Sequence, residues 1–179
     1  MTKKLKALIA IGGTGGRVFP GYNLAAHLDS NNYDVELVSD KRGIKYLKDI
    51  KGLKVTKLPF TPIIPRNIFT IFVSLILISY SFLRSTIFLI NNRPSIIFGM
   101  GGYASFPICI AASILKIKFV IYENNLIIGK ANKYLLPFSE KILVSYKDLE
   151  GIPEKYRNKI IEVGNIIKKN IINFPKQSN

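Results

Sequence analysis

Two glycine-rich segments are the parts of this sequence best suited to hold a ligand against bare backbone. The first, GGTGG at residues 12–16, and the second, GMGGYASFP at residues 99–107, each follow a short apolar run. Glycine lets the backbone approach a phosphate, and the amides at the start of a helix add a partial positive charge. The first segment has neither the dinucleotide-binding spacing nor a Walker lysine, so alone it is a weak signal for an anion site, and the alternative is a tight strand-to-helix turn. Two such loops could converge on one anion, and a diphosphate would fit better than a single phosphate.

A third polar segment, YENN at residues 122–125, follows another apolar run. The carboxylate of Glu123 could accept a proton, and the amides of Asn124 and Asn125 could hold sugar hydroxyls. The alternative is that the asparagines only cap the next helix.

The elements that must position these segments follow an alternating pattern. We expect strands at residues 5–11, 33–39, 53–59, 95–100, 118–123, 141–146 and 159–164. We expect helices that begin near Pro20 and span residues 41–50, 67–90, 106–116 and 127–138. Alternating strands and helices, with several strands apolar throughout, predict a doubly wound α/β fold with a parallel sheet covered on both faces. Ligands bind beyond the carboxyl ends of such strands, so all three polar segments should meet at one edge.

Residues 67–90 form a long apolar block whose uncharged part, Ile68 to Leu83, is shorter than the about 20 residues of a membrane span. Arg84 could snorkel and lengthen it, and a helix here would carry a thin polar stripe. Three interpretations are open: a core helix, a helix lying at a membrane surface, and a membrane span. The interval from Lys51 to Tyr122 holds lysine and arginine but no acidic residue, which favours the surface helix because anionic headgroups attract such charge. The predicted lipid contacts are Ile68, Phe69, Phe72, Leu75 and Ile76.

Composition narrows the class of protein. A chain of 179 residues suits one domain, and its formal net charge of +15 indicates a polyanionic partner or a lysine-rich solvated surface. Nucleic acid is not the expected partner, because the aromatic residues lie in the apolar block and do not alternate with basic ones as in a stacking platform.

Cys109, His27 and the apolar run at the N-terminus are each interpreted as structural. The lone Cys109 lies in an apolar context, which excludes a disulfide framework and suits a reducing compartment. His27, the one histidine, lies in a helical pattern and is interpreted as structural. The apolar run at the N-terminus is shorter than the roughly seven to fifteen residues of a signal-peptide core, so we expect a first strand there.

The segments GGTGGRVFP, GMGGYASFP, ENNLIIGKANK and VGN resemble the MurG glycosyltransferases in order and approximate spacing. The resemblance runs from Leu5 to about Lys168. It implies a Rossmann-like acceptor-binding domain at residues 1–165, similar to the N-terminal half of a two-domain GT-B type glycosyltransferase. It also implies that residues 166–179 begin a linker or a disordered tail, and that the second, donor-binding domain is absent. We therefore expect little or no transferase activity from this chain alone.

The resemblance also assigns site residues. Donor contacts carried over from the family are Thr14, Gly15, Gly16, Asn125 and Lys168. The acceptor diphosphate is expected at Gly13, Arg17, Gly101, Gly102 and Tyr103. Glu123 is the candidate general base, and no metal ion or other cofactor is expected.

Some residues depart from the family pattern. Arg17 stands where the family usually has a histidine, and because a guanidinium stays protonated it cannot act as a base, although it can bind a diphosphate in bidentate fashion. Tyr122, Ile166 and Lys168 replace a histidine, a proline and an arginine of the family.

The implied function is transfer of N-acetylglucosamine from UDP-N-acetylglucosamine to the undecaprenyl-diphosphate-linked muramyl-pentapeptide in peptidoglycan synthesis. The implied location is peripheral, on the cytoplasmic face of the bacterial inner membrane. A separate chain carrying the donor domain would complete the enzyme. The alternative is a non-catalytic module at the membrane that binds polyprenyl-diphosphate lipid or recruits partners.

Overall fold

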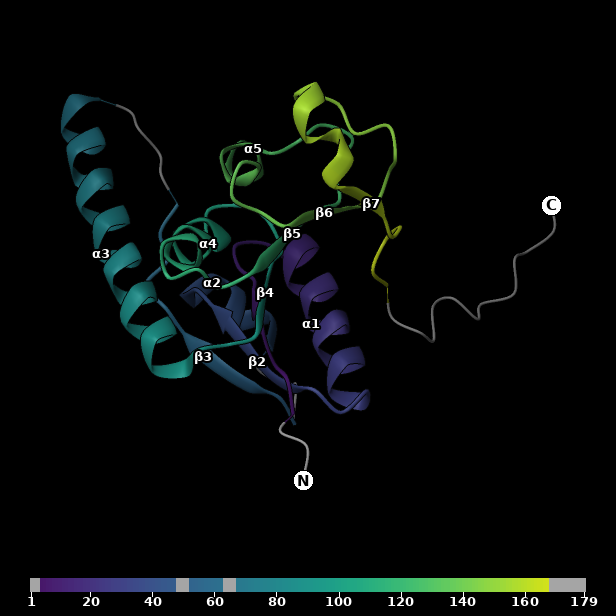
Figure 1. Cartoon of the computed structure of the whole chain (residues 1–179). Coiled ribbons are helices and arrows are strands. Elements are labelled where there is room, and N and C mark those ends of the chain that lie inside the picture. Colours follow the sequence, from purple (N-terminus) through teal and green to yellow (C-terminus); the bar gives the residue numbers. More distant parts are fainter. Residues whose placement is uncertain (1–3, 48–51, 63–66, 168–179) are drawn as a thin grey trace, which may run out of the picture.

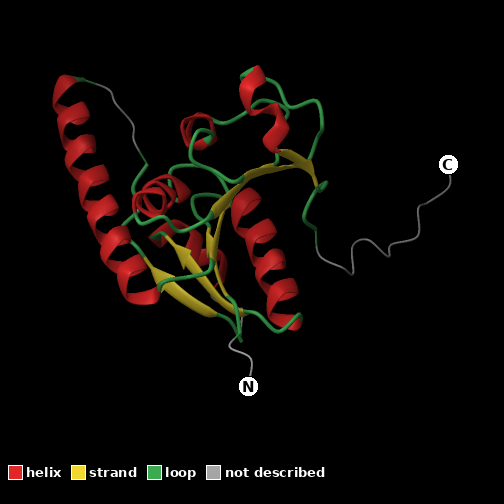
Figure 2. Cartoon of the chain, viewed as in Figure 1, coloured by secondary structure: helices red, strands yellow, loops and turns green. Residues whose placement is uncertain are grey.

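The computed structural model describes residues 4–47, 52–62 and 67–167. Its strands form one parallel sheet in the order β3-β2-β1-β4-β5-β6-β7, with its helices on both faces (Figure 1; Figure 2). The strands are β1 (Lys6–Ala10), β2 (Asp34–Ser39), β3 (Lys54–Lys57), β4 (Ile96–Gly99), β5 (Phe119–Glu123), β6 (Lys141–Val144) and β7 (Ile160–Glu162). The predicted α/β fold with a parallel sheet is therefore confirmed.

The helices are α1 (Gly15–Ser30), α2 (Lys41–Ile44), η1 (Lys45–Leu47), α3 (Ile68–Asn92), α4 (Ser105–Ile114), α5 (Lys130–Leu135) and η2 (Glu154–Lys159). The sheet separates the hydrophobic core into two clusters, one on each of its faces. Strand β1 shows the division, because Ala7 and Ile9 pack in the cluster that holds α1, while Leu8 and Ala10 pack in the cluster that holds α4 and α5. Alternate residues of a strand point to opposite faces, so a continuous apolar strand supplies both cores.

Helix α1 begins at Gly15, which makes the prediction of a start near Pro20 wrong. Thr14, in extended conformation, precedes the first turn, so Gly15 and Gly16 belong to the helix. Pro20 lies inside the helix and has no N–H to donate to the carbonyl of Gly16. The side chain of Asn124 donates to that oxygen at 3.3 Å, so a partner from the other side of the site replaces the missing helical donor.

Helix α3 lies outside α4, as a further layer on one face of the sheet (Figure 1). It begins with a capping box, in which Thr70 N donates to the side chain of Asn67 at 2.8 Å and Asn67 N donates to Thr70 Oγ1 at 2.9 Å. Its buried residues are Ser81, Ser85 and Leu89, and Ser81 donates to the carbonyl of Pro59. Ser81 and Ser85, two serines of the predicted polar stripe, thus point toward the rest of the domain.

The opposite face of α3 is exposed and apolar. Ile68 is 85% exposed, Phe69 70% and Phe72 62%. The other exposed large apolar residues of α3 are Ile71, Val73, Leu75, Ile76, Leu77, Tyr80, Leu83, Ile87 and Ile90. A core helix would be largely buried, so that interpretation of residues 67–90 is wrong. By length and composition α3 could cross a membrane.

Candidate ligand site at the carboxyl ends of the strands

The loops after β1, β4 and β5 meet at one edge of the sheet, as the sequence predicts, and the loop after β2 joins them there. Strand order reverses between β1 and β4, and a crevice at such a point is where open α/β sheets bind ligands. Gly12 shows how closely the loops approach, since a Cβ placed on it would lie 2.5 Å from the Cβ of Ala104. Only glycine fits there.

Asp40, at the end of β2, ties three of these loops together. Its side chain is buried, and its Oδ1 accepts from the backbone N–H groups of Gly13 at 3.2 Å and Gly43 at 2.7 Å. Its Oδ2 accepts from the Tyr103 hydroxyl at 2.5 Å. Sequence reasoning missed Asp40, although an acid directly after an apolar strand and three residues before Gly43 is a helix-capping signal.

Tyr103 covers the first loop. A Cβ on Gly13 would lie 3.4 Å from the tyrosine ring, and Gly13 has a φ of +81°, which side-chain-bearing residues rarely adopt. Burial and the hydrogen bond to the Asp40 carboxylate raise the pKa of Tyr103 to about 12. The phenol therefore stays protonated at neutral pH and keeps donating to Asp40.

Arg17 projects from the first turn of α1 onto the second glycine loop. A Cβ on Gly102 would lie 3.1 Å from the guanidinium, and one on Gly101 would lie 3.7 Å from its Nε. Among the described residues, the guanidinium of Arg17 has no hydrogen-bond or ion-pair partner, although its backbone N–H donates to Thr14 O at 3.1 Å. An unpaired, half-buried cation thus lies beside a pair of glycines, an arrangement that suits a bidentate anion such as a diphosphate.

Glu123 is surrounded by donors. Its side chain is buried, its Oε1 accepts from Asn125 N at 3.2 Å and Asn125 Nδ2 at 2.6 Å, and its Oε2 accepts from Gly129 N at 2.9 Å and Asn132 Nδ2 at 3.0 Å. These bonds hold the loop between β5 and α5. Both oxygens are occupied, so a general base here would have to give up one of these donors when it takes a proton, and that role stays a prediction.

Four of the five predicted donor contacts fall within the described residues, and they lie at the same edge. Thr14, Gly15 and Gly16 form the start of α1, and the bond from Asn124 to Gly16 O brings the segment with Asn125 next to them. Lys168 lies outside the described residues. Tyr122, which replaces a histidine of the resembling family, shares a 2.8 Å hydrogen bond with Ser145. The assignment of these residues to a donor stays a prediction.

A cavity of about 560 Å³ opens beside Arg17 and the second glycine loop. It runs between this loop, α3 and α5. Its lining residues are Arg17, Thr61, Pro62, Ile78, Ser81, Gly101, Gly102, Tyr103, Phe106, Pro107, Glu123, Gly129, Lys130, Ala131 and Tyr134.

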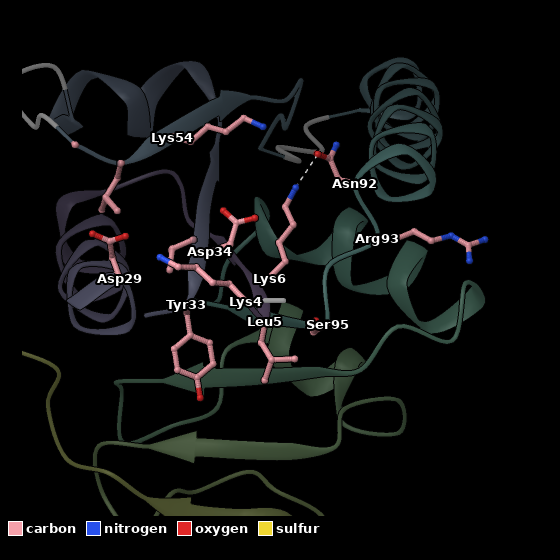
Figure 3. Close-up of a pocket in the computed structure, with 13 residues that line it drawn as sticks. Lys4, Leu5, Lys6, Asp29, Tyr33, Asp34, Lys54, Asn92, Arg93 and Ser95 are labelled. Atoms are coloured by element: carbon pink, nitrogen blue, oxygen red, sulfur yellow. Dashed lines mark hydrogen bonds between the residues drawn. The ribbon is translucent and has the colours of Figure 1, made fainter. Parts of the chain in front are cut away.

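A larger cavity, about 810 Å³, lies at the amino ends of the strands, where Figure 3 shows Lys6 reaching Asn92 at the end of α3. Two of its lysines are already engaged, because Lys6 and Lys54 lie 3.3 and 3.1 Å from the buried carboxylate of Glu36. Burial would raise the pKa of Glu36, but hydrogen bonds from Thr56 and Lys54 and the charges of Lys54 and Lys6 lower it overall. This end of the sheet is a structural ion-pair cluster, so we place the ligand site at the other end.

Residues 7–144 match the family model described as "Glycosyltransferase family 28 N-terminal domain". The chain belongs to this family. This domain accounts for most of the described fold, and together with the curated relatives that follow it confirms the resemblance to MurG enzymes.

Two curated relatives of this family 28 domain are 35% and 36% identical to it in sequence. The UDP-N-acetylglucosamine–N-acetylmuramyl-(pentapeptide) pyrophosphoryl-undecaprenol N-acetylglucosamine transferase of Pelagibacter ubique is 35% identical over 97% of this chain and 47% of the relative. The enzyme of the same name from Rickettsia canadensis is 36% identical over 94% of this chain and 46% of the relative. The chain therefore spans about half the length of these curated relatives.

Solved structures show the same fold. MurG of Acinetobacter baumannii matches with a TM-score of 0.73 at 18% identity, over 92% of this chain and 46% of that one. A UDP-N-acetylglucosamine 2-epimerase matches with a TM-score of 0.65 at 16% identity, over 91% of this chain and 49% of that one. At these identities the structures establish fold alone.

Proposed function

We propose that this family 28 domain is the acceptor-binding half of an N-acetylglucosaminyltransferase of peptidoglycan synthesis. The names of the curated relatives support the reaction, which joins N-acetylglucosamine from UDP to an undecaprenyl-diphosphate-linked muramyl-pentapeptide. In the transfer, an acceptor hydroxyl forms a bond to the sugar C1, the bond from C1 to UDP breaks, and a base takes the hydroxyl proton.

The observation that carries the proposal is Arg17 beside Gly101 and Gly102. A diphosphate can bind where an unpaired guanidinium lies beside glycines whose backbone it can approach closely. The hydrogen bonds of Asp40 to Gly13 and Tyr103 hold the two glycine loops in place. The acceptor's diphosphate would lie there, and its sugar would reach toward Glu123. UDP-N-acetylglucosamine would lie against Thr14, Gly15, Gly16 and Asn125, with a second domain closing the site.

The exposed face of α3 supports a location on the membrane surface. Its apolar residues face outward along the whole helix, and at its end Arg93, Lys116 and Lys118 line a small cavity together with Leu89 and Ile90. Apolar residues next to basic ones are typical of helices that lie at an anionic bilayer surface. The acceptor lipid is in that bilayer, so α3 would bring the domain to its substrate at the cytoplasmic face.

A vesicle experiment tests the location. We expect tighter binding to anionic than to neutral vesicles, and weaker binding for Phe72→Ser than for the control Phe138→Ser, since Phe72 is 62% and Phe138 53% exposed but only Phe72 lies on α3. Equal binding to both kinds of vesicle would contradict it.

A complementation experiment tests the reaction. Labelled N-acetylglucosamine transfer from UDP to a short-chain acceptor lipid would be measured for this chain alone and for this chain joined to the unmatched half of the Pelagibacter ubique relative. We expect transfer by the joined protein and loss of transfer in its Arg17→Ala variant. Acceptor binding without transfer by the joined protein would support a non-catalytic module.

A further inference from the structure

The cavity beside Arg17 has a lining of both basic and apolar residues. Arg17 and Lys130 are its basic residues, and the Arg17 guanidinium lies beside Gly102. Its large apolar lining residues are Pro62, Ile78, Phe106, Pro107 and Tyr134. At about 560 Å³ the cavity has the size of sites that enclose most of a small organic ligand, for which typical volumes are about 300–1,000 Å³.

The lining of the cavity carries unbalanced positive charge. Glu123 is the one acidic residue in the lining, and its two oxygens already accept four hydrogen bonds. Arg17 and Lys130 have no acidic partner among the residues that the structure describes. The basic residues of the lining therefore fit an anionic group and its apolar residues fit a hydrocarbon, which together describe an amphiphile.

The apolar wall continues onto the exposed face of α3. Ile78 lines the cavity, and Leu75 and Ile71 precede it by three and seven positions, a spacing that places all three on one side of a helix. Leu75 is 57% and Ile71 45% exposed. An apolar row thus connects the cavity to the surface that we assign to the bilayer.

From this geometry we propose that the cavity binds the first isoprene units of the acceptor lipid. The inference rests on the proposed function, and it adds that the protein itself recognises the tail, which enters between α3 and α5 while the diphosphate lies at Arg17. Membrane insertion of α3 would then align the cavity with the lipid that it takes up.

Binding without any membrane separates this role from bilayer attachment. The probes are farnesyl diphosphate and inorganic diphosphate, measured by calorimetry with the full chain in vesicle-free buffer. We expect farnesyl diphosphate to bind at least about tenfold more tightly, because its apolar groups leave water in the cavity. Equal affinities would overturn the tail site but leave the diphosphate site intact, whereas failure of both probes to bind would overturn the proposed function as well.

Matched variants locate the effect. Tyr134→Ala and Ile78→Asn should bring the affinity for farnesyl diphosphate close to that for inorganic diphosphate, and Arg17→Ala should weaken both. Tyr134 is 69% exposed, so its truncation leaves the core intact. The controls Tyr146→Ala and Ile87→Asn, at exposed positions outside the cavity, should keep the preference. An unchanged preference in both cavity variants, with the fold confirmed by circular dichroism, would overturn the proposal.

Discussion

The hydroxyl of Tyr103 donates a 2.5 Å hydrogen bond to Asp40, and this bond joins the second glycine loop to the end of β2. Asp40 also accepts from the backbone of Gly13, so one buried carboxylate holds both glycine loops in register. The two loops that face the proposed diphosphate are therefore held together through the same carboxylate.

Tyr103→Phe should lower the free energy of unfolding by about 2 kcal/mol, because it leaves one buried oxygen of Asp40 without its donor. The ring that covers Gly13 is kept, so the effect isolates the hydroxyl. Urea denaturation measures the change, with the exposed Tyr146→Phe as control. Equal stability of the two variants would show that the bond to Asp40 contributes nothing.

Gly102→Ala should weaken binding of inorganic diphosphate about tenfold, because its methyl group would lie 3.1 Å from the guanidinium and displace Arg17. Gly164→Ala is the matched control, since Gly164 has a similar φ, +71° against +75°, and open space where its Cβ would lie. Both variants should lose about 1 kcal/mol of stability from the left-handed backbone. Only Gly102→Ala should bind inorganic diphosphate more weakly, which calorimetry would measure. Equal affinities of the two variants for diphosphate would show that Arg17 does not bind it.

Asn124→Ala should lower the free energy of unfolding by about 1 kcal/mol, because Pro20 gives the carbonyl of Gly16 no helical donor to replace the lost one. In a Pro20→Ala background the helix supplies that donor, so the same substitution should cost less. A double-mutant cycle measured by thermal denaturation tests the coupling. Additive effects of the two substitutions would mean that Asn124 does not compensate for Pro20.

Glu36→Gln should lower the free energy of unfolding by about 2 kcal/mol at neutral pH, since Lys6 and Lys54 lose their buried partner. The folded state lowers the pKa of Glu36, so its stabilising effect is present above the ordinary value of 4.5 and is lost as the pH falls through the lower, folded-state value. The gap between wild type and variant should therefore narrow in acid. Denaturation curves across this range measure it, and Glu154→Gln, which breaks a surface pair with Arg157, should have little effect at any pH. A gap that is constant with pH would contradict the ion-pair account.

The fold could be predicted from the sequence because its signals are local. Apolar runs such as Ala7 to Ile11 alternate with helical segments, and each glycine loop directly follows such a run. The start of α1 was mispredicted because proline usually marks a first helical turn, and only the contact with Asn124 shows how Pro20 is accommodated inside the helix.

The hydrogen bonds that join the loops of the site could not be predicted, because several of them connect residues far apart in the chain. Asp40 and Tyr103 are 63 positions apart, and only the strand order brings their loops together. Three of the four donors around Glu123 come from the loop between β5 and α5, whose path the sequence does not specify, and the fourth, Asn132, lies in α5. For α3, composition left three interpretations open, and only the exposure of its apolar residues excludes the core helix.

The central claim is that Arg17 binds the acceptor's diphosphate, and the affinity of a short-chain muramyl-pentapeptide diphospholipid for this chain tests it most directly. Calorimetry would compare wild type, Arg17→Ala and the control Arg157→Ala, a surface arginine on η2. The account predicts at least about tenfold weaker binding for Arg17→Ala and wild-type affinity for Arg157→Ala. Wild-type affinity in Arg17→Ala would contradict it.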